Sequence, residues 1–205
     1  PGISTYNIVG IDVGYSSLKG YSQKHKYQFP SFVKKAPLSR LNFGKESATN
    51  IQYRDEKGDI WLVGEAALDI VGMNDTEESS KTLYSRNRFE SPLFKIPDLV
   101  GIAFSEPDRN KPFKVMTGLP PKFMNDKDEL IEALMGRHIF SVKRGNGNWK
   151  DYDITLKENE IGVIQQGMGA LFSYAVDVMG KFISDKIKIL NEKVLVIDGG
   201  MNTFD

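Results

Sequence analysis

Two short stretches of the sequence have the composition of phosphate-binding turns. Residues 11–19 read IDVGYSSLK, and residues 197–205 read IDGGMNTFD. In both stretches an aspartate follows a hydrophobic run and precedes small or polar turn residues. Such residues let backbone N–H groups approach phosphoryl oxygens closely, and their hydroxyl groups supply further donors. These stretches are therefore the first candidates for a site that handles phosphate.

Asp12, Asp198 and Lys19 have the side-chain chemistry that accompanies bound phosphate. Mg²⁺ prefers a few carboxylates and keeps much of its hydration, so each aspartate could hold the ion or its waters. The lysine could neutralise phosphate charge. Taken alone, each stretch more often forms an ordinary hairpin turn, because Asp and Gly are favoured there for backbone reasons. Two such stretches that frame one α/β unit favour the phosphate site.

Hydrophobic patterning predicts the strands that position these stretches. An antiparallel meander is expected at the start of the chain, and hairpin turns are expected at residues 55–58 and 145–148. The expected strands cover residues 8–13, 18–22, 27–29, 60–63, 113–117, 152–156 and 193–197. Residues 74–81 are expected to form a polar loop.

Two helices are expected between the later strands. Asp126 followed by Glu129 predicts a capping box at the start of the first helix. The apolar face of that helix is expected to carry Leu130, Ile131, Leu134, Met135 and His138. The second helix is expected to carry Leu171, Phe172, Ala175, Val176, Met179, Phe182 and Ile183. Strands that alternate with helices after a meander predict an α/β domain with a mixed sheet.

The composition excludes several classes of protein. The 205 residues are 40% hydrophobic and 26% charged, as in ordinary globular proteins. The 27 basic residues match 27 acidic ones, and this zero net charge argues against a direct electrostatic grip on nucleic acid. Without cysteine there is no disulfide, thiolate metal site or cysteine nucleophile. No apolar run could span a bilayer and no signal peptide is visible, so we expect a cytoplasmic protein without a membrane partner.

With these motifs, the chain resembles the actin-like ATPases, and among them the prokaryotic actins of the plasmid-segregation (ParM) type. Residues 12–19 resemble the first phosphate loop of the family, and residues 198–205 resemble the second. Residues 163–170 (VIQQGMGA) are similar to the connecting segment in which a glutamine or glutamate positions the attacking water. Residues 29–31 (FPS) and 117–120 (TGLP) are also similar to stretches of prokaryotic actin-like proteins.

The resemblance implies an ATP (or GTP) site with Mg²⁺ in a cleft between two domains. It implies catalytic roles for Gln166 and Asp198, and metal binding by Asp12 and Asp198. The residues implied to bind the nucleotide are Asp12, Gly14, Tyr15, Ser16, Ser17, Lys19, Gly199, Gly200, Asn202 and Thr203. Gln166 is neutral, so it would orient a water and could not act as a strong base. Met201 departs from the pattern, because many members have glycine there, and it could alter the backbone approach to the γ-phosphate.

The resemblance covers nearly the whole chain, but only as the N-terminal domain of the family. It implies an actin-like (ribonuclease H-like) α/β fold for residues 1–205, with a core of residues 1–37 and 111–197. A smaller subdomain would be inserted at about residues 38–110, and residues 198–205 would begin a second domain. The two-domain protein is expected to have ATPase activity. This chain alone is expected to bind nucleotide poorly. The implied role is a filament subunit for plasmid or DNA segregation, which self-associates and reaches DNA through an adaptor protein.

Other interpretations of the same residues stay open. A small-molecule kinase of the same superfamily would share both phosphate loops, although we identify no acidic general base for it. A nucleotide-free interaction or assembly domain would keep only the fold. Gln166 could instead cap the following helix, Lys19 could be a solvated strand residue, and His138 could edge the core without binding a metal.

Overall fold

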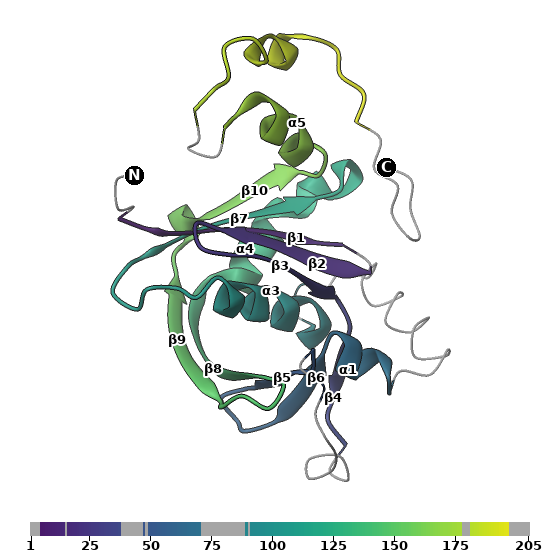
Figure 1. The fold of residues 1–205 in the computed structure, drawn as a ribbon, viewed down its shortest axis with the longest axis vertical. Coiled ribbons are helices and arrows are strands. Elements are labelled where there is room, and N and C mark those ends of the chain that lie inside the picture. The colour runs from purple at the N-terminus through teal and green to yellow at the C-terminus, as the bar shows by residue number, and fades with distance from the viewer. Residues whose placement is uncertain are drawn as a thin grey trace.

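The chain forms two five-stranded sheets with one long helix between them (Figure 1). The computed structural model describes residues 5–14, 16–37, 47, 49–70, 89, 91–177 and 181–196. In the first sheet the strand order is β10-β7-β1-β2-β3, and in the second it is β4-β6-β5-β8-β9. The predicted α/β architecture with a mixed sheet is confirmed, because the first sheet contains both parallel and antiparallel pairs.

The first sheet contains the N-terminal meander and two later parallel strands. Its strands are β1 (Asn7–Val13), β2 (Ser17–Ser22), β3 (Lys26–Pro30), β7 (Phe113–Leu119) and β10 (Ile161–Gln165). β2 pairs antiparallel with β1 and β3, whereas β7 runs parallel to both β1 and β10. Along β1, Val9 and Ile11 are buried and Ile8 is exposed, the alternation expected of a sheet with one covered face.

The second sheet is antiparallel throughout. Its strands are β4 (Val33–Lys35), β5 (Ile51–Arg54), β6 (Ile60–Val63), β8 (Gly136–Arg144) and β9 (Lys150–Leu156). Both predicted hairpins are confirmed, because β5 pairs with β6 and β8 pairs with β9. The sheet extends beyond the expected insert at residues 38–110, since β4 precedes that range and both β8 and β9 follow it.

Helix α3 (Pro92–Phe104) packs between the sheets and carries much of the core. It contacts β1 and β2 of the first sheet and β4 of the second. Figure 1 shows it lying between the two sheets. The side chain of Ser91 caps its first turn by accepting a hydrogen bond from the backbone N–H of Leu93. Every residue from Ile96 to Ala103 is buried. The sequence had not predicted a helix in this region.

The remaining helices are short. They are α1 (Glu65–Leu68), α4 (Lys127–Leu134) and α5 (Met168–Ala175), together with the 3₁₀ turns η3 (Pro121–Asp126), η4 (Glu158–Glu160) and η5 (Ile187–Asn191). No helix in the described parts of the chain is both long and apolar enough to cross a bilayer.

The predicted extent of the helix at α4 was wrong. Met135 has extended dihedral angles, and Gly136 has a φ of +109°, so the helix stops at Leu134 and β8 begins. His138 therefore lies on β8, where its Nε2 atom is 2.8 Å from the backbone oxygen of Leu134. The predicted capping box is also absent, because Asp126 makes no side-chain cap.

After β10, the predicted second helix is confirmed only as far as Ala175, and the predicted last strand was wrong. Helix α5 ends at Ala175, because Val176 is extended and forms a β-bridge with Phe182. Two backbone hydrogen bonds hold this reversal, Asp177 N to Lys181 O and Ile183 N to Ala175 O, each 2.8 Å. Residues 193–196 form no strand. The expected polar loop at residues 74–81 lies outside the described residues.

Candidate functional site

Three parallel strands of the first sheet end along one edge. Because β1, β7 and β10 are parallel, their carboxyl ends meet there. Asp12 is the penultimate residue of β1, Leu119 is the last residue of β7, and Gln166 directly follows β10. In α/β proteins, ligands bind beyond the carboxyl ends of such strands. This edge therefore brings together the first predicted phosphate loop and the predicted water-positioning glutamine.

A hydrogen bond joins Gln166 to Asp12, two predicted site residues that are 154 positions apart in the sequence. The Nε2 atom of Gln166 donates to Oδ1 of Asp12 at 3.3 Å, and both side chains are half-buried. The backbone N–H of Gln166 donates to the oxygen of Leu119 at 2.8 Å, so the residue is also fixed to β7. The alternative role of Gln166 as a helix cap is not observed, because α5 has no side-chain cap.

Two glycines make room for Gln166. A Cβ atom on Gly118 would lie 3.2 Å from Cγ of Gln166, so a larger residue there would push the glutamine side chain. Gly167 has a φ of +92°, which lets the chain turn sharply from β10 into α5. Val196 packs beside this turn, since a Cβ on Gly167 would lie 3.6 Å from its Cγ1 atom.

The β1–β2 turn, of which Gly14, Ser16 and Ser17 are described, is closed by backbone hydrogen bonds. Gly14 N–H donates to the oxygen of Ser17 at 3.0 Å. Ser31, which follows β3, holds the turn from the side. Its hydroxyl group donates to the oxygen of Gly14 at 2.8 Å, and its backbone N–H donates to the oxygen of Ser16 at 3.2 Å. Ser17 Oγ accepts a hydrogen bond from Gln28 Nε2 at 3.1 Å.

Lys19 lies opposite Asp12 in the β1–β2 ladder. Directly opposed residues share one face of a sheet, and the buried Leu18 points to the other face, toward the core. Lys19 is exposed, so its ammonium group is free to meet an anion at this edge. The same exposure also fits the alternative of a solvated strand residue.

The other predicted site residues lie outside the described residues. They are Tyr15 of the first loop and Asp198, Gly199, Gly200, Asn202 and Thr203 of the second. Met201 lies there too. Within the described residues, no three His, Cys, Asp or Glu side chains gather into a metal-binding cluster. Asp12 alone still suits Mg²⁺, because this ion needs only one or two carboxylates and keeps several waters.

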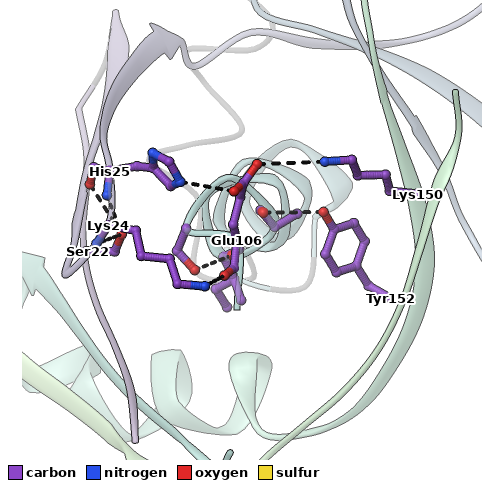
Figure 2. Close-up of polar contacts among 9 residues, drawn as sticks. Ser22, Lys24, His25, Glu106, Lys150 and Tyr152 are labelled. Atoms are coloured by element: carbon purple, nitrogen blue, oxygen red, sulfur yellow. Dashed lines mark hydrogen bonds and ion pairs between the residues drawn. The ribbon is translucent and has the colours of Figure 1, made fainter. Parts of the chain in front are cut away.

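Two acidic residues that the sequence analysis missed lie away from this edge. Glu106 receives His25 Nε2 at 3.1 Å and Lys150 Nζ at 3.7 Å on its two carboxylate oxygens (Figure 2). These partners, led by the hydrogen bond from His25, lower the pKa of the Glu106 carboxyl. Asp98 of α3 is fully buried instead, and burial raises its pKa to about 8. No sequence motif marks either residue, because their surroundings come from distant strands.

Sequence comparison decides the family of this domain. Residues 10–169 match the family described as "Actin like proteins N terminal domain". The chain belongs to this actin-like family. The match includes Asp12, Lys19 and Gln166 and ends before the second predicted phosphate loop. Among curated protein sequences, none gives a significant match.

The actin-like domain has the fold of solved ParM-type proteins. A 15-stranded ParM filament from Clostridium botulinum is 22% identical with a TM-score of 0.60, and the alignment covers 82% of this chain and 50% of that one. The apo psk41 ParM protein is 16% identical with a TM-score of 0.65, covering 87% and 55%. The actin-like protein Alp7A is 14% identical with a TM-score of 0.59, covering 88% and 50%. The chain thus spans about half the length of these relatives.

Proposed function

We propose that this actin-like domain forms one wall of a site that binds and hydrolyses ATP or GTP, and that nucleotide controls assembly into filaments. The observation that carries the proposal is the hydrogen bond between Gln166 and Asp12, which are 154 positions apart in the sequence. It joins the predicted water-positioning residue to the predicted phosphate loop, at the edge where ligands of α/β sheets bind.

The chemistry proposed for Gln166 follows from its amide group. Its nitrogen is engaged by the Asp12 carboxylate, so the amide oxygen is the atom left to accept a hydrogen bond from a water. An amide is too weak a base to take the proton, so it acts by orientation. In phosphoryl transfer, positioning and electrostatic stabilisation supply most of the catalysis. A slow turnover suited to timing a filament is consistent with a neutral residue in this place.

Asp12, together with Asp198, would hold Mg²⁺ through its waters, and Lys19 would lie near the phosphates. The bound ion would neutralise charge on the phosphate oxygens. The β1–β2 turn would offer backbone N–H groups to the same oxygens, as small-residue turns do in anion-binding nests. Val196, two residues before Asp198 in the sequence, packs beside Gly167 at the start of α5.

The proposal also includes filament formation and a role in DNA segregation. Two solved relatives are described as filaments, the C. botulinum ParM and Alp12. By analogy, this protein would self-associate and serve plasmid or DNA segregation or a related prokaryotic cytoskeletal role in the cytoplasm. The 27 basic and 27 acidic residues balance, so contact with DNA would pass through an adaptor protein.

Sedimentation and turnover of the full-length protein test the proposal. With Mg²⁺ and ATP or GTP, we expect sedimenting polymer and release of inorganic phosphate. Gln166→Ala should lower kcat by roughly a hundredfold, the usual scale for a group that handles the attacking water. Gln165→Ala is the matched control, because this exposed neighbour should leave the rate unchanged. Equal rates for both variants would remove Gln166 from the mechanism, and neither polymer nor hydrolysis in the wild type would refute the proposed function.

A further inference from the structure

Ser31 occupies a position from which one side chain can control the β1–β2 turn. Its hydroxyl group donates to the Gly14 oxygen at 2.8 Å, while its backbone N–H donates to the Ser16 oxygen at 3.2 Å. Among the described residues, no other side chain donates a hydrogen bond to the backbone of this turn. A further side-chain bond at the turn runs from Gln28 Nε2 to the Ser17 hydroxyl group.

The backbone of Ser31 is itself held on both sides. Pro30, just before it, lies opposite Ser17 in the β2–β3 ladder. Phe32, just after it, accepts a hydrogen bond from Gly64 N at 2.9 Å, and Val33 then pairs with Val63 in the second sheet. Ser31 is therefore the residue at which the chain leaves the turn of the first sheet and enters the second.

A hydrogen bond to the Gly14 oxygen has consequences for anion binding. A peptide group is planar, so holding its oxygen also fixes the direction of the N–H at its other end. Gly14 can sit in this close turn because it lacks a Cβ, which would lie 3.1 Å from the Ser17 oxygen. Glycine is also the residue most free to rotate, so the turn gains most from an external restraint.

We infer that Ser31 is a positioning residue for the candidate nucleotide site, whose side chain holds the β1–β2 turn in the conformation that receives phosphate. This inference rests on the proposed function. Ser31 acts through the Gly14 peptide group and need not touch the nucleotide. Because its backbone is fixed to the second sheet, it also ties the orientation of the turn to that sheet.

The test compares Ser31→Ala, Ser31→Thr and Ser105→Ala in the full-length protein. Threonine keeps the hydroxyl group. Ser105→Ala removes a similar bond, from Ser105 Oγ to the Ile102 oxygen at 2.6 Å, at the far end of α3. Two quantities are measured. One is exchange of the Gly14 amide without nucleotide, by NMR, because its hydrogen bond to the Ser17 oxygen closes the turn. The other is the affinity for ATP with Mg²⁺, by titration calorimetry.

For Ser31→Ala we expect Gly14 amide exchange to become roughly two- to tenfold faster and ATP affinity to fall by a similar factor, the effect of one net hydrogen bond. Ser31→Thr and Ser105→Ala should keep wild-type values for both. Unchanged exchange in Ser31→Ala would overturn the role of Ser31 in holding the turn. If the wild type binds ATP and Ser31→Ala binds it equally well, only the role of Ser31 in the nucleotide site would be overturned. Failure of the wild type to bind ATP or GTP would instead refute the proposed function.

Discussion

Asp12 and Asp98 carry the same side chain in opposite environments. Asp12 is half-buried at the edge of the first sheet and accepts a hydrogen bond from Gln166. Asp98 is 1% exposed in α3, and neither of its carboxylate oxygens has a hydrogen-bond partner among the described residues. A buried carboxylate without a partner is costly, so the neutral form is favoured. Burial raises the pKa of Asp98 to about 8, and the nearby Tyr27 hydroxyl, also buried, has a raised pKa as well.

The raised pKa of Asp98 predicts a pH-dependent stability that one substitution removes. The unfolded chain loses this proton near pH 4, whereas the folded protein keeps it to about pH 8. Between these values the unfolded state binds fewer protons, so the free energy of unfolding falls as pH rises, by up to ~1.4 kcal/mol per pH unit. Asp98→Asn cannot ionise and should become more stable than the wild type as pH rises toward 8. Urea unfolding at several pH values measures this, and parallel curves for the two proteins would contradict it.

The residues of the candidate site differ in whether the sequence alone could identify their role. Asp12, Lys19 and Gln166 were identified because their neighbours form recognisable motifs. Gly118 and Ser31 were quoted only as parts of similar stretches, and their roles depend on distances to Gln166 and Gly14 that no local pattern encodes. Distances of this kind come from strand order, which a single sequence leaves open.

At the scale of elements, strands were predicted better than helices. The two-residue period of a strand could be recognised in the sequence of β1, β2, β3 and β7. These strands alternate buried and exposed residues or are separated by typical turn residues. Helix α3 was missed because it is buried between two sheets from Ile96 to Ala103 and contains Pro97, so it has neither an amphipathic period nor a typical helix interior. The helix predicted beyond Ala175 was wrong because an apolar period cannot show that the chain reverses at Val176.

The packing of β2 against β3 depends on the absence of a side chain at Gly20. A Cβ there would lie 1.8 Å from Cε2 of Tyr27, whose ring packs edge-on against Phe104 at 5.9 Å. Gly20→Ala should therefore displace the Tyr27 ring and cost ~1–3 kcal/mol of unfolding free energy, as overpacking does. Thermal or urea unfolding measures the loss.

Gly10→Ala is the control for this prediction. It introduces the same methyl group on β1, where the nearest atom would be the Tyr21 oxygen at 3.9 Å. Its effect should stay within about 0.5 kcal/mol, the range of substitutions that meet no neighbour. If Gly20→Ala were as mild as Gly10→Ala, the Tyr27 ring would not be the constraint on the β2–β3 pair.

At the scale of the whole molecule, an apolar contact and a polar contact between the sheets can be compared among the described residues. One is the apolar packing of α3, whose Val100 and Ile102 are completely buried. The other is the polar cluster around Glu106, where His25 of the β2–β3 hairpin and Lys150 of β9 meet one carboxylate (Figure 2). The Glu106 side chain is 55% exposed, so solvent screens these ion pairs, and pairs of this kind contribute less than ~1 kcal/mol. The apolar packing of α3 should therefore contribute more to the free energy of unfolding than these ion pairs do.

Two substitutions measured at two salt concentrations separate these contributions. Ile102→Ala leaves a cavity between the sheets and should cost ~2–5 kcal/mol whether salt is present or not. Glu106→Gln keeps the size of the side chain at this position of positive φ (+48°). It removes the charge and one acceptor oxygen at an exposed site, so its cost should stay below ~1 kcal/mol at low salt. In about 1 M salt, where the Debye length is about 3 Å, that small cost should largely vanish. Urea unfolding of both variants at both salt concentrations gives the four changes in unfolding free energy. A Glu106→Gln loss as large as that of Ile102→Ala, or one that salt does not reduce, would mean that the ion pairs rather than α3 hold the two sheets together.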